Sequence, residues 1–427
     1  LLLLILTIII MVISSVGSIL NLETVYYNVN SVTGELETQI VTINNLFNRT
    51  GLQYLVSNML SNFMNFTPLT TLIVGLLGVG VVYKSGFLNA LFKIMIKNKP
   101  KKLFTFLVVL FGVISSMFFD AAYVILIPLA AILFMNLGRH PSAGICAAFA
   151  GITFGYGANI FINGLDNALI TYTQSATKIL DQNYIVSLSG NIIFMIFATL
   201  LISYFGMVIT ERYIVPKLGK YTLSEDDPDI SYELSKKEVK GVYIALLSLL
   251  IIAVITIYCI TPNLPFSGLL LYLKDSTYIS QLFGDNSYFN QGSVFIFSAS
   301  IAVAGMVYGI RTKSIKNNRD LVDGMSYYLS GFSSLLVLIF FAAQFCLIFK
   351  QTNIGVFIVV SLSELLSRLQ LSGVMLIIIS FIIIVISTFF VPVASTKWAI
   401  LSPVMVPMFM QSSFTPEFAQ AVFRAAD

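Results

Sequence analysis

The sequence predicts an all-α membrane protein that crosses the bilayer several times. Of its 427 residues, 57% are hydrophobic and only 10% are charged. A soluble domain carries about 25% charged residues, so this chain has too few charges to cover a surface in water. Apolar stretches of the length that a helix needs to span a bilayer, about 20 residues, also recur along the chain.

The composition argues against several other functions. The net charge is +4 without a long basic run, so nucleic-acid binding is not expected. One histidine and three cysteines cannot build a usual His/Cys metal site, and no Ser/His pair or clustered metal set of an enzyme is present in the sequence. We therefore expect no enzymatic activity and no cofactor, apart from Na⁺ or H⁺ as a coupling ion.

Residues 1–66 are expected to hold a first transmembrane helix and an outer loop. Leu1–Leu20 is apolar and lacks the small-residue cleavage site of a signal peptide, which favours a spanning helix. Asn21–Phe66 is polar and rich in Asn and Thr. The chain opens in mid-run without Met and stops at Asp427 inside an apparent helix, so we expect segments to be missing at both ends.

Residues 67–210 are expected to form a first repeat that contains a hairpin at about 103–137. Leu103–Ser116 and Ala121–Leu137 are each too short for an ordinary span. Basic residues flank the pair on both sides, and segments rich in Lys and Arg face the cytoplasm. The pair is therefore predicted to enter and leave from the cytoplasm as a re-entrant hairpin, with two tightly tilted spans as the alternative.

A broken helix is predicted at about 142–170, because Gly155-Tyr-Gly157 interrupts an apolar run. No strand precedes these glycines and no third Gly follows at the right spacing, so they do not form a dinucleotide fingerprint. Residues 211–320 then hold a charged cytoplasmic linker and two spans, Val242–Ile260 and Val294–Ile310.

Residues 321–427 are predicted to repeat the earlier pattern in the opposite orientation. Ser402–Met410 resembles Ile127–Met135 at an offset of 275 residues, although chance similarity among apolar segments is an alternative. The second hairpin, about 373–411, falls on the side poor in Lys and Arg and is expected to open outward. Inverted repeats of this kind are typical of secondary transporters, in which substrate and ions bind where helices break near the midplane.

Polar residues within the apolar segments are functional candidates, because an ionisable group inside a membrane is costly. In the two hairpins and the helices after them these are Asp120, Asn159, Asp166, Ser395, Lys397, Trp398, Arg424 and Asp427.

Most of these candidates have a structural alternative. Asp120 could cap a helix, and Asp166 could lie near the outer interface. Arg424 and Asp427 are three residues apart on one helical face and could pair with each other. Lys397 is expected to extend to the outer interface rather than to take part in the site.

Several stretches resemble one family of transporters. They are Asp120-Ala-Ala-Tyr-Val-Ile-Leu-Ile-Pro128, Gly138-Arg-His-Pro-Ser-Ala-Gly144, Gly164-Leu-Asp166, Ser395-Thr-Lys-Trp-Ala-Ile-Leu-Ser-Pro403 and Ala421-Val-Phe-Arg-Ala-Ala-Asp427. Together these stretches resemble the AbgT family, within the ion-transporter superfamily, over nearly the whole chain.

The resemblance implies a fold, an activity and a set of residues. It implies nine spans, two re-entrant hairpins and a homodimer with a solvent-filled basin, in the inner membrane of a bacterium. It implies transport of p-aminobenzoyl-glutamate or export of sulfonamide antimetabolites on the proton gradient. The positions that match residues on which family transport depends are Asp166, Ser395, Trp398, Pro416, Arg424 and Asp427. The chain departs from the family pattern at Thr388, where an Asn is usual ten places before the Trp.

These residues suggest an alternating-access mechanism for an aromatic carboxylate. Arg424 would bind the substrate carboxylate as a planar two-point donor, and Trp398 would pack on the aromatic ring. Ser395 and Asn159 would donate hydrogen bonds. Asp166 is the first candidate to carry a coupling proton, because desolvation favours the protonated carboxyl.

Other ion-coupling candidates and two other functions stay open. Asp120, Asp427 and Thr388 are the remaining candidates for the coupling ion. A sodium-coupled dicarboxylate or short-chain fatty-acid transporter of the same superfamily is the close alternative, and a channel is the alternative of another class.

Overall fold

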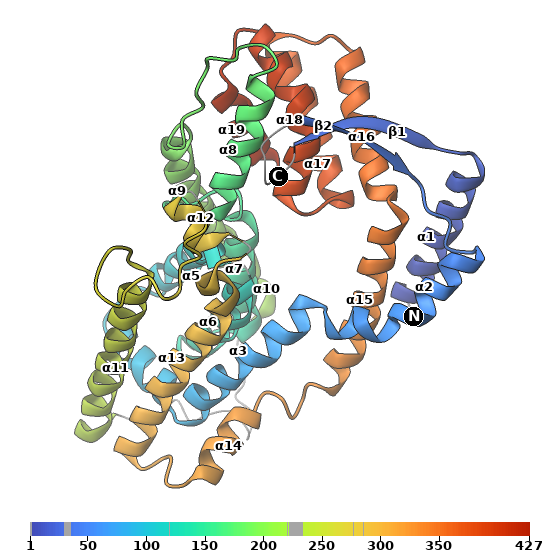
Figure 1. The fold of residues 1–427 in the computed structure, drawn as a ribbon. Helices are drawn as coiled ribbons and strands as arrows, with labels where there is room; N and C mark the ends of the chain where they lie inside the picture. The colour runs from blue at the N-terminus through green and yellow to red at the C-terminus, as the bar shows by residue number, and fades with distance from the viewer. Residues whose placement is uncertain are drawn as a thin grey trace. The chain divides into compact units, whose positions relative to one another are not determined.

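The computed structural model confirms a helical membrane fold. It describes residues 2–29, 36–118, 120–219, 221, 234–275, 277–284 and 286–427. Among these residues, eight helices are long and apolar enough to cross a membrane. Figure 1 shows the helices together with one antiparallel pair of strands near the N-terminus. The chain divides into two compact units, each described by itself below.

Unit 1 comprises residues 1–66, 162–194 and 335–427. Its helices and strands are α1 (Leu2–Ile19), β1 (Glu23–Val29), β2 (Leu36–Thr42), α2 (Arg49–Met64), α8 (Gly164–Thr177), most of α15 (Ser333–Thr352), α16 (Ile354–Arg368), α17 (Gly373–Phe390), α18 (Ala394–Gln411) and α19 (Pro416–Ala426).

Unit 2 comprises residues 67–161 and 195–334. It contains α3 (Thr67–Lys84), α4 (Phe87–Ile96), α5 (Lys101–Ser115), the 3-10 turn Ser116–Phe118, α6 (Asp120–Asn136), α7 (Pro141–Phe154), most of α9 (Ile192–Ile209), the π-helical turn Thr210–Ile214, α10 (Val215–Leu218), α11 (Lys236–Ile260), α12 (Tyr278–Phe283), α13 (Tyr288–Thr312) and α14 (Asn318–Ser326). Its core includes Phe104, Phe134 and Tyr308.

The described parts of the segment Asn21–Phe66, residues 21–29 and 36–66, were predicted to be a polar loop but contain two strands and a helix. Strands β1 and β2 pair antiparallel, with Glu23 opposite Thr42 and Val29 opposite Leu36. Strand β1 has the sequence Glu-Thr-Val-Tyr-Tyr-Asn-Val, in which β-branched and aromatic residues favour a strand despite the low hydropathy. Asn48 caps α2 by accepting a hydrogen bond from the Gly51 N–H. Low hydropathy alone therefore gave a wrong prediction for this segment.

The helices begin where a side chain can satisfy the first free backbone N–H groups. At the start of α11, Ser235 accepts from the Glu238 N–H, and the Glu238 side chain accepts in return from the Ser235 N–H. Ser287 caps α13, and Thr415 caps α19 ahead of Pro416. Proline costs nothing at this first position, because its missing N–H would have no partner within the helix.

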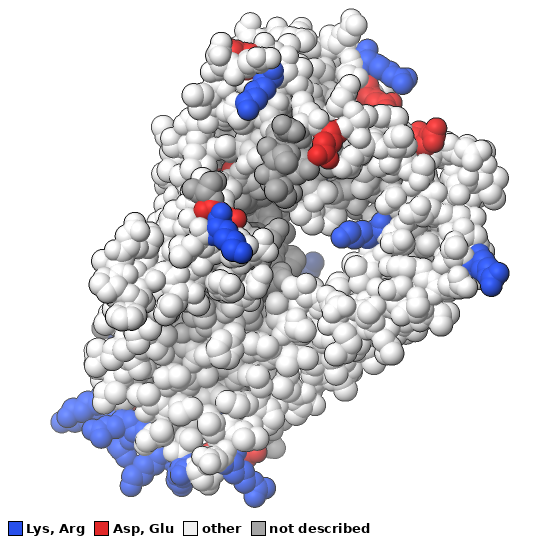
Figure 2. Space-filling view, viewed as in Figure 1, with Lys and Arg blue, Asp and Glu red and all other residues white. Residues whose placement is uncertain are grey.

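Helix α11 gives unit 2 an apolar surface suited to lipid, and basic side chains of the same unit gather at one end. Helix α11 buries only Gly241, Val242 and Ala245 and exposes large apolar side chains along its length. Exposed Lys and Arg residues lie at the start of α11 and after the end of α13, and Figure 2 shows them gathered at the lower left of the view. Because such groups favour the cytoplasmic side, this clustering is the basis of the orientation prediction, which stays a prediction.

Each unit contains two helices separated by a short break. In unit 2, α5 and its 3-10 turn are followed by α6, and α7 packs against both helices. In unit 1, Val391-Pro392-Val393 separates α17 from α18, and α19 packs against both. The order of elements is the same in the two units, as the predicted repeat requires. The inverted orientation of the two repeats stays a prediction. The re-entrant path of the helix pairs α5–α6 and α17–α18 stays a prediction as well.

A partly buried ion pair fixes the end of the first helix pair. Arg139, in the turn between α6 and α7, forms a bidentate pair with Glu211, and its Nη2 lies 2.7 Å from Oε2. Thr105 of α5 donates to the same carboxylate. Glu211 lies in the π-helical turn that follows α9. One carboxylate therefore ties three segments of unit 2 together.

Helices α3 and α13 approach each other closely at Gly78. The Ser298 hydroxyl accepts from the Gly78 N–H at 3.1 Å and donates to the Val74 carbonyl at 2.6 Å. A Cβ added at Gly78 would lie 2.2 Å from the Ser298 carbonyl oxygen, so only glycine fits at this contact.

We expect Gly78→Ala to lower the free energy of unfolding by about 1–3 kcal/mol, because the added methyl group forces α3 away from α13. Thermal unfolding in detergent measures the effect. Gly331→Ala is the matched control, since no atom lies within 4 Å of the added Cβ. Equal melting temperatures for the two variants would contradict the close contact.

Candidate functional site

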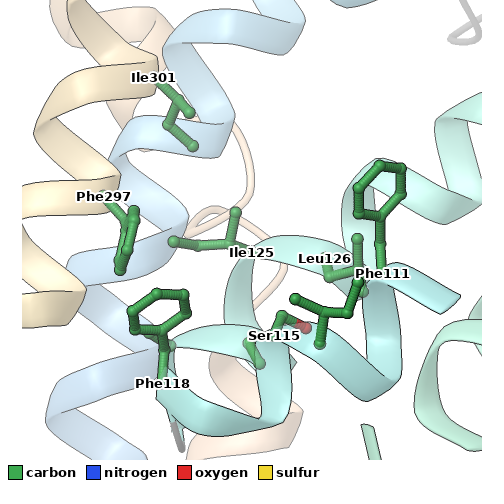
Figure 3. A pocket seen from close by; sticks show the side chains of 10 residues that line it. Phe111, Ser115, Phe118, Ile125, Leu126, Phe297 and Ile301 are labelled. Atoms are coloured by element: carbon green, nitrogen blue, oxygen red, sulfur yellow. The ribbon is translucent and has the colours of Figure 1, made fainter. Parts of the chain in front are cut away.

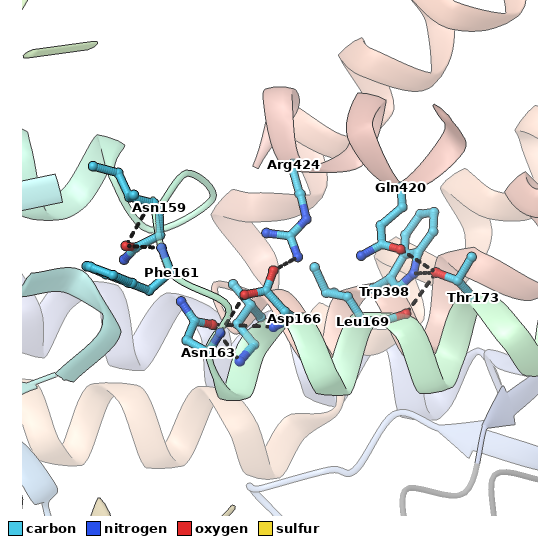
Figure 4. A network of polar contacts seen from close by, with 11 residues as sticks. Asn159, Phe161, Asn163, Asp166, Leu169, Thr173, Trp398, Gln420 and Arg424 are labelled. Carbon is cyan, nitrogen blue, oxygen red and sulfur yellow. Dashed lines mark hydrogen bonds and ion pairs between the residues drawn. The ribbon is translucent and has the colours of Figure 1, made fainter. Parts of the chain in front are cut away.

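The carboxylate of Asp166 lies in the first turn of α8 and is held there by the residue that caps the N-terminal end of this helix. Asn163 precedes the helix and accepts hydrogen bonds from the N–H groups of Leu165 and Asp166, at 2.9 and 3.3 Å. In return, Asp166 Oδ2 accepts from the Asn163 N–H at 2.7 Å. This reciprocal cap fixes the Asp166 carboxylate and leaves Oδ1 directed to other groups (Figure 4).

Asp166 pairs with Arg424 of α19. The Arg424 Nη2 contacts Asp166 Oδ1, and only 2% of Asp166 and 7% of Arg424 are exposed. Arg424 and Asp427 do not pair with each other, although their spacing on one helical face allowed it. A tertiary contact with α8 provides the partner for Arg424 instead, as Figure 4 shows.

A second buried ion pair joins α18 to the end of α19. Lys397 is completely buried, and its Nζ contacts Asp427 Oδ1 and donates to Thr388 Oγ1 of α17 at 2.6 Å. The expectation that Lys397 reaches the outer interface is therefore wrong. An ammonium extends to an interface only when water is within reach of its stem, and here a carboxylate inside unit 1 is nearer.

Trp398 is packed and hydrogen-bonded within unit 1. Its Nε1 donates to Thr173 Oγ1 of α8 at 2.9 Å, and Gln420 Oε1 lies 3.3 Å from the same hydroxyl. The rings of Trp398 and Phe423 have centroids 4.6 Å apart with 35° between their planes, and both residues are completely buried. In this conformation Phe423 covers the face of Trp398 that was expected to meet a substrate ring.

The start of α19 is anchored by Glu417, next to the predicted site residue Pro416. Tyr184 donates its hydroxyl to Glu417 Oε2 at 2.9 Å, and the Ser187 N–H donates to Oε1 at 3.0 Å. Desolvation, followed by the hydrogen bond to Glu417, raises the pKa of the Tyr184 phenol. Ser395, also predicted, lies partly buried in the first turn of α18.

Two predicted residues belong to unit 2. Asn159 donates its amide to the carbonyls of Val113 and Ile114 at 3.3 and 3.2 Å, so it satisfies the C-terminal end of α5. Its Oδ1 accepts from the Ile160 N–H at 2.8 Å. Asp120 begins α6, but its side chain lies outside the described residues.

A hollow of about 320 Å³ lies beside the break between α5 and α6. Phe111, Phe118 and Phe297 line it, with Ser115 as its polar member (Figure 3). The described side chains that line this hollow carry no charge, so none of them offers a partner for a carboxylate. The charged network of unit 1 is the better candidate for an anionic solute.

The structure thus places five predicted residues in polar contacts among the packed helices of unit 1. They are Asp166, Thr388, Trp398, Arg424 and Asp427. Sequence reasoning missed the contributions of Thr173, Gln420 and Phe423, assigned no role to Asn163, and expected Lys397 at the outer interface. The Asn163-x-x-Asp166 spacing was a usable signal, because it matches a capping box. Within the described ranges, no three His, Cys, Asp or Glu side chains converge as metal ligands would.

The sequence matches the model of one protein family along its whole length. The model of the AbgT putative transporter family matches residues 1–427. The chain belongs to the AbgT family. It is a multi-pass membrane transporter, and the resemblance of the sequence to this family is confirmed.

Three relatives place this AbgT chain among transporters. It is 32% identical to the p-aminobenzoyl-glutamate transport protein of Escherichia coli (strain K12), over 91% of this chain and 74% of that protein. The Alcanivorax borkumensis YdaH transporter is 28% identical, with a TM-score of 0.53, over all of this chain and 85% of its own. Neisseria gonorrhoeae MtrF, of a class of antimetabolite efflux pumps, is 33% identical, with a TM-score of 0.54, over all of this chain and 83% of its own.

The buried Asp166–Arg424 pair predicts that removing one of its charges lowers the free energy of unfolding more than removing both. Asp166→Leu leaves a buried guanidinium without its carboxylate and is expected to cost about 3–5 kcal/mol of unfolding free energy. Asp166→Leu combined with Arg424→Leu removes both charges, so we expect it to recover most of that loss. Thermal unfolding in detergent compares the two.

Arg368→Leu is the control for this comparison. Its side chain is 78% exposed and pairs with Glu364 on the same helix, so we expect a change within about 0.5 kcal/mol. A double variant no more stable than Asp166→Leu would show that the pair is not the reason for the loss.

Proposed function

We propose that this protein is a secondary active transporter of p-aminobenzoyl-glutamate or related aromatic carboxylates and sulfonamide antimetabolites, coupled to the proton gradient. One observation carries the proposal: an arginine and an aspartate form a buried pair between α8 and α19. The names of the E. coli relative and of MtrF support the solute class.

The pair provides a physical route from solute binding to proton movement. A guanidinium binds a planar carboxylate at two points, so a solute carboxylate competes with Asp166 for Arg424. Arginine stays charged in proteins, so it cannot be the group that takes up a proton. Once displaced, Asp166 lies beside a second anion in a desolvated site, where its protonated form is favoured. Solute and proton would therefore load together.

The other candidate residues have supporting roles in this proposal. Ser395, in the first turn of α18, would donate its hydroxyl to the solute, while the role predicted for Asn159 of unit 2 stays a prediction. Trp398 would provide an aromatic face once Phe423 moves away from it. Pro416 fixes the start of α19 and thereby the position of Arg424.

We further infer a homodimer in the inner membrane of a bacterium, on the basis of the family resemblance. Sodium coupling is the alternative to proton coupling. Thr388 and Asp427 of unit 1 would be candidate oxygen ligands, since hard cations prefer carboxylate and hydroxyl oxygens. Asp120 of unit 2 stays a separate candidate for the coupling ion.

Asp166→Asn keeps the shape of the side chain but cannot carry the proton. We expect it to lower proton-driven uptake of p-aminobenzoyl-glutamate into proteoliposomes by at least tenfold, while solute exchange at equal pH on both sides is less affected. Full gradient-driven transport by this variant would make the assignment of Asp166 wrong.

Separate gradients identify the coupling ion. We expect accumulation of p-aminobenzoyl-glutamate when a proton gradient is imposed without Na⁺, and none when a Na⁺ gradient is imposed at equal pH. Accumulation on the Na⁺ gradient alone would favour the sodium-coupled alternative. Flux that never concentrates the solute would favour a channel.

A further inference from the structure

The second ion pair of unit 1 has no role in the mechanism above. Lys397 and Asp427 are joined within the same packed group of helices as Asp166 and Arg424. Among the described residues, Lys397 is the only lysine that is completely buried. A buried cation of this kind is costly to retain, so a structural role alone would be served as well by apolar residues of similar size.

The two cations neighbour, in the sequence, the two residues of one aromatic contact. Arg424 follows Phe423 directly in α19, and Lys397 precedes Trp398 directly in α18. The Lys397 Nζ lies 5.8 Å from the Phe423 ring centroid, and Phe423 packs on Trp398. Each cation has one aspartate as its ion-pair partner and comes from a helix that also contributes one of the two rings.

We propose that Lys397 is a second carboxylate-binding cation, which makes the site specific for a solute with two carboxylates and an aromatic ring. This inference rests on the proposed function. Arg424 would take one solute carboxylate in place of Asp166, and Lys397 would take the other in place of Asp427. The ring would pack against Trp398.

The charge balance of the exchange fixes the number of protons. The two ion pairs, Asp166 with Arg424 and Asp427 with Lys397, hold two cations and two aspartates and are together neutral. A solute with two carboxylates adds two negative charges, so the loaded site stays neutral only when Asp166 and Asp427 each take one proton from water. The groups that face Lys397 are Asp427, Thr388 and the Phe423 ring, and those that face Asp166 are Arg424 and the Asn163 N–H. We therefore expect two protons per dicarboxylate and one per monocarboxylate.

Two solutes of nearly the same shape test the inference. p-Aminobenzoyl-glutamate carries two carboxylates, and p-aminobenzoyl-glutamine carries one carboxylate and one amide. Titration calorimetry of the whole protein in detergent, in buffers that differ in ionisation enthalpy, gives both the affinity and the number of protons taken up. We expect the wild-type protein to prefer the glutamate compound by about tenfold to a hundredfold, the value of one charged hydrogen-bonded contact.

The variant removes both charges of the second pair at once. Lys397→Met with Asp427→Asn keeps the site neutral and leaves no unpaired buried charge. We expect the preference for the glutamate compound to be lost or reversed, because its second carboxylate then has no cation to bind. A pair with a structural role alone would lower both affinities together and leave their ratio and the proton count unchanged.

A matched control neutralises the exposed pair of α16, Glu364→Gln with Arg368→Gln, and should leave the ratio and the proton count as in the wild type. A double variant at Lys397 and Asp427 that still prefers the glutamate compound and still takes up two protons would overturn the inference but not the proposed function. Wild-type protein that binds and transports neither compound would overturn both.

Discussion

The candidate site depends on one constraint: a charge buried inside a membrane protein must be paired. Asp166 and Lys397 are almost or completely buried, and each has its partner on another helix. Helices in lipid gain little from apolar contact with each other, so polar contacts contribute much of their specificity. The ion pairs therefore decide how α8, α17, α18 and α19 pack, and they do so with the same groups that a charged solute needs.

The constraint also connects stability to transport. A pair that is costly to break is not costly to exchange, because another anion can replace the aspartate on the cation. The solute carboxylate then takes the role of a structural group, and the displaced aspartate is neutralised by a proton. In this conformation Phe423 covers Trp398, so the ring has to move before a solute reaches the cations. The closed packing and the proposed exchange are two states of one network.

Some of this could be predicted from local patterns, and some could not. Hydropathy indicated the spanning helices and the breaks near residues 117 and 392, because apolar length and interruptions by a charged residue or Pro are local properties. It failed for Asn21–Phe66, where strand propensity rather than hydropathy decides the structure. It also failed for Lys397, because whether a lysine reaches water depends on what surrounds it.

The sequence by itself determined that the protein lies in a bilayer, which family it belongs to, and which charged residues lie within its apolar segments. A bilayer is the only environment that suits so few charges, and the motifs around Asp166, Trp398 and Arg424 are specific to one group of transporters. Only the tertiary structure decided the partners. Spacing along α19 places Arg424 and Asp427 on one face, but opposite charges pair with whatever group the packing brings nearest. Those groups, Asp166 and Lys397, lie on other helices, and only the packing brings them to α19.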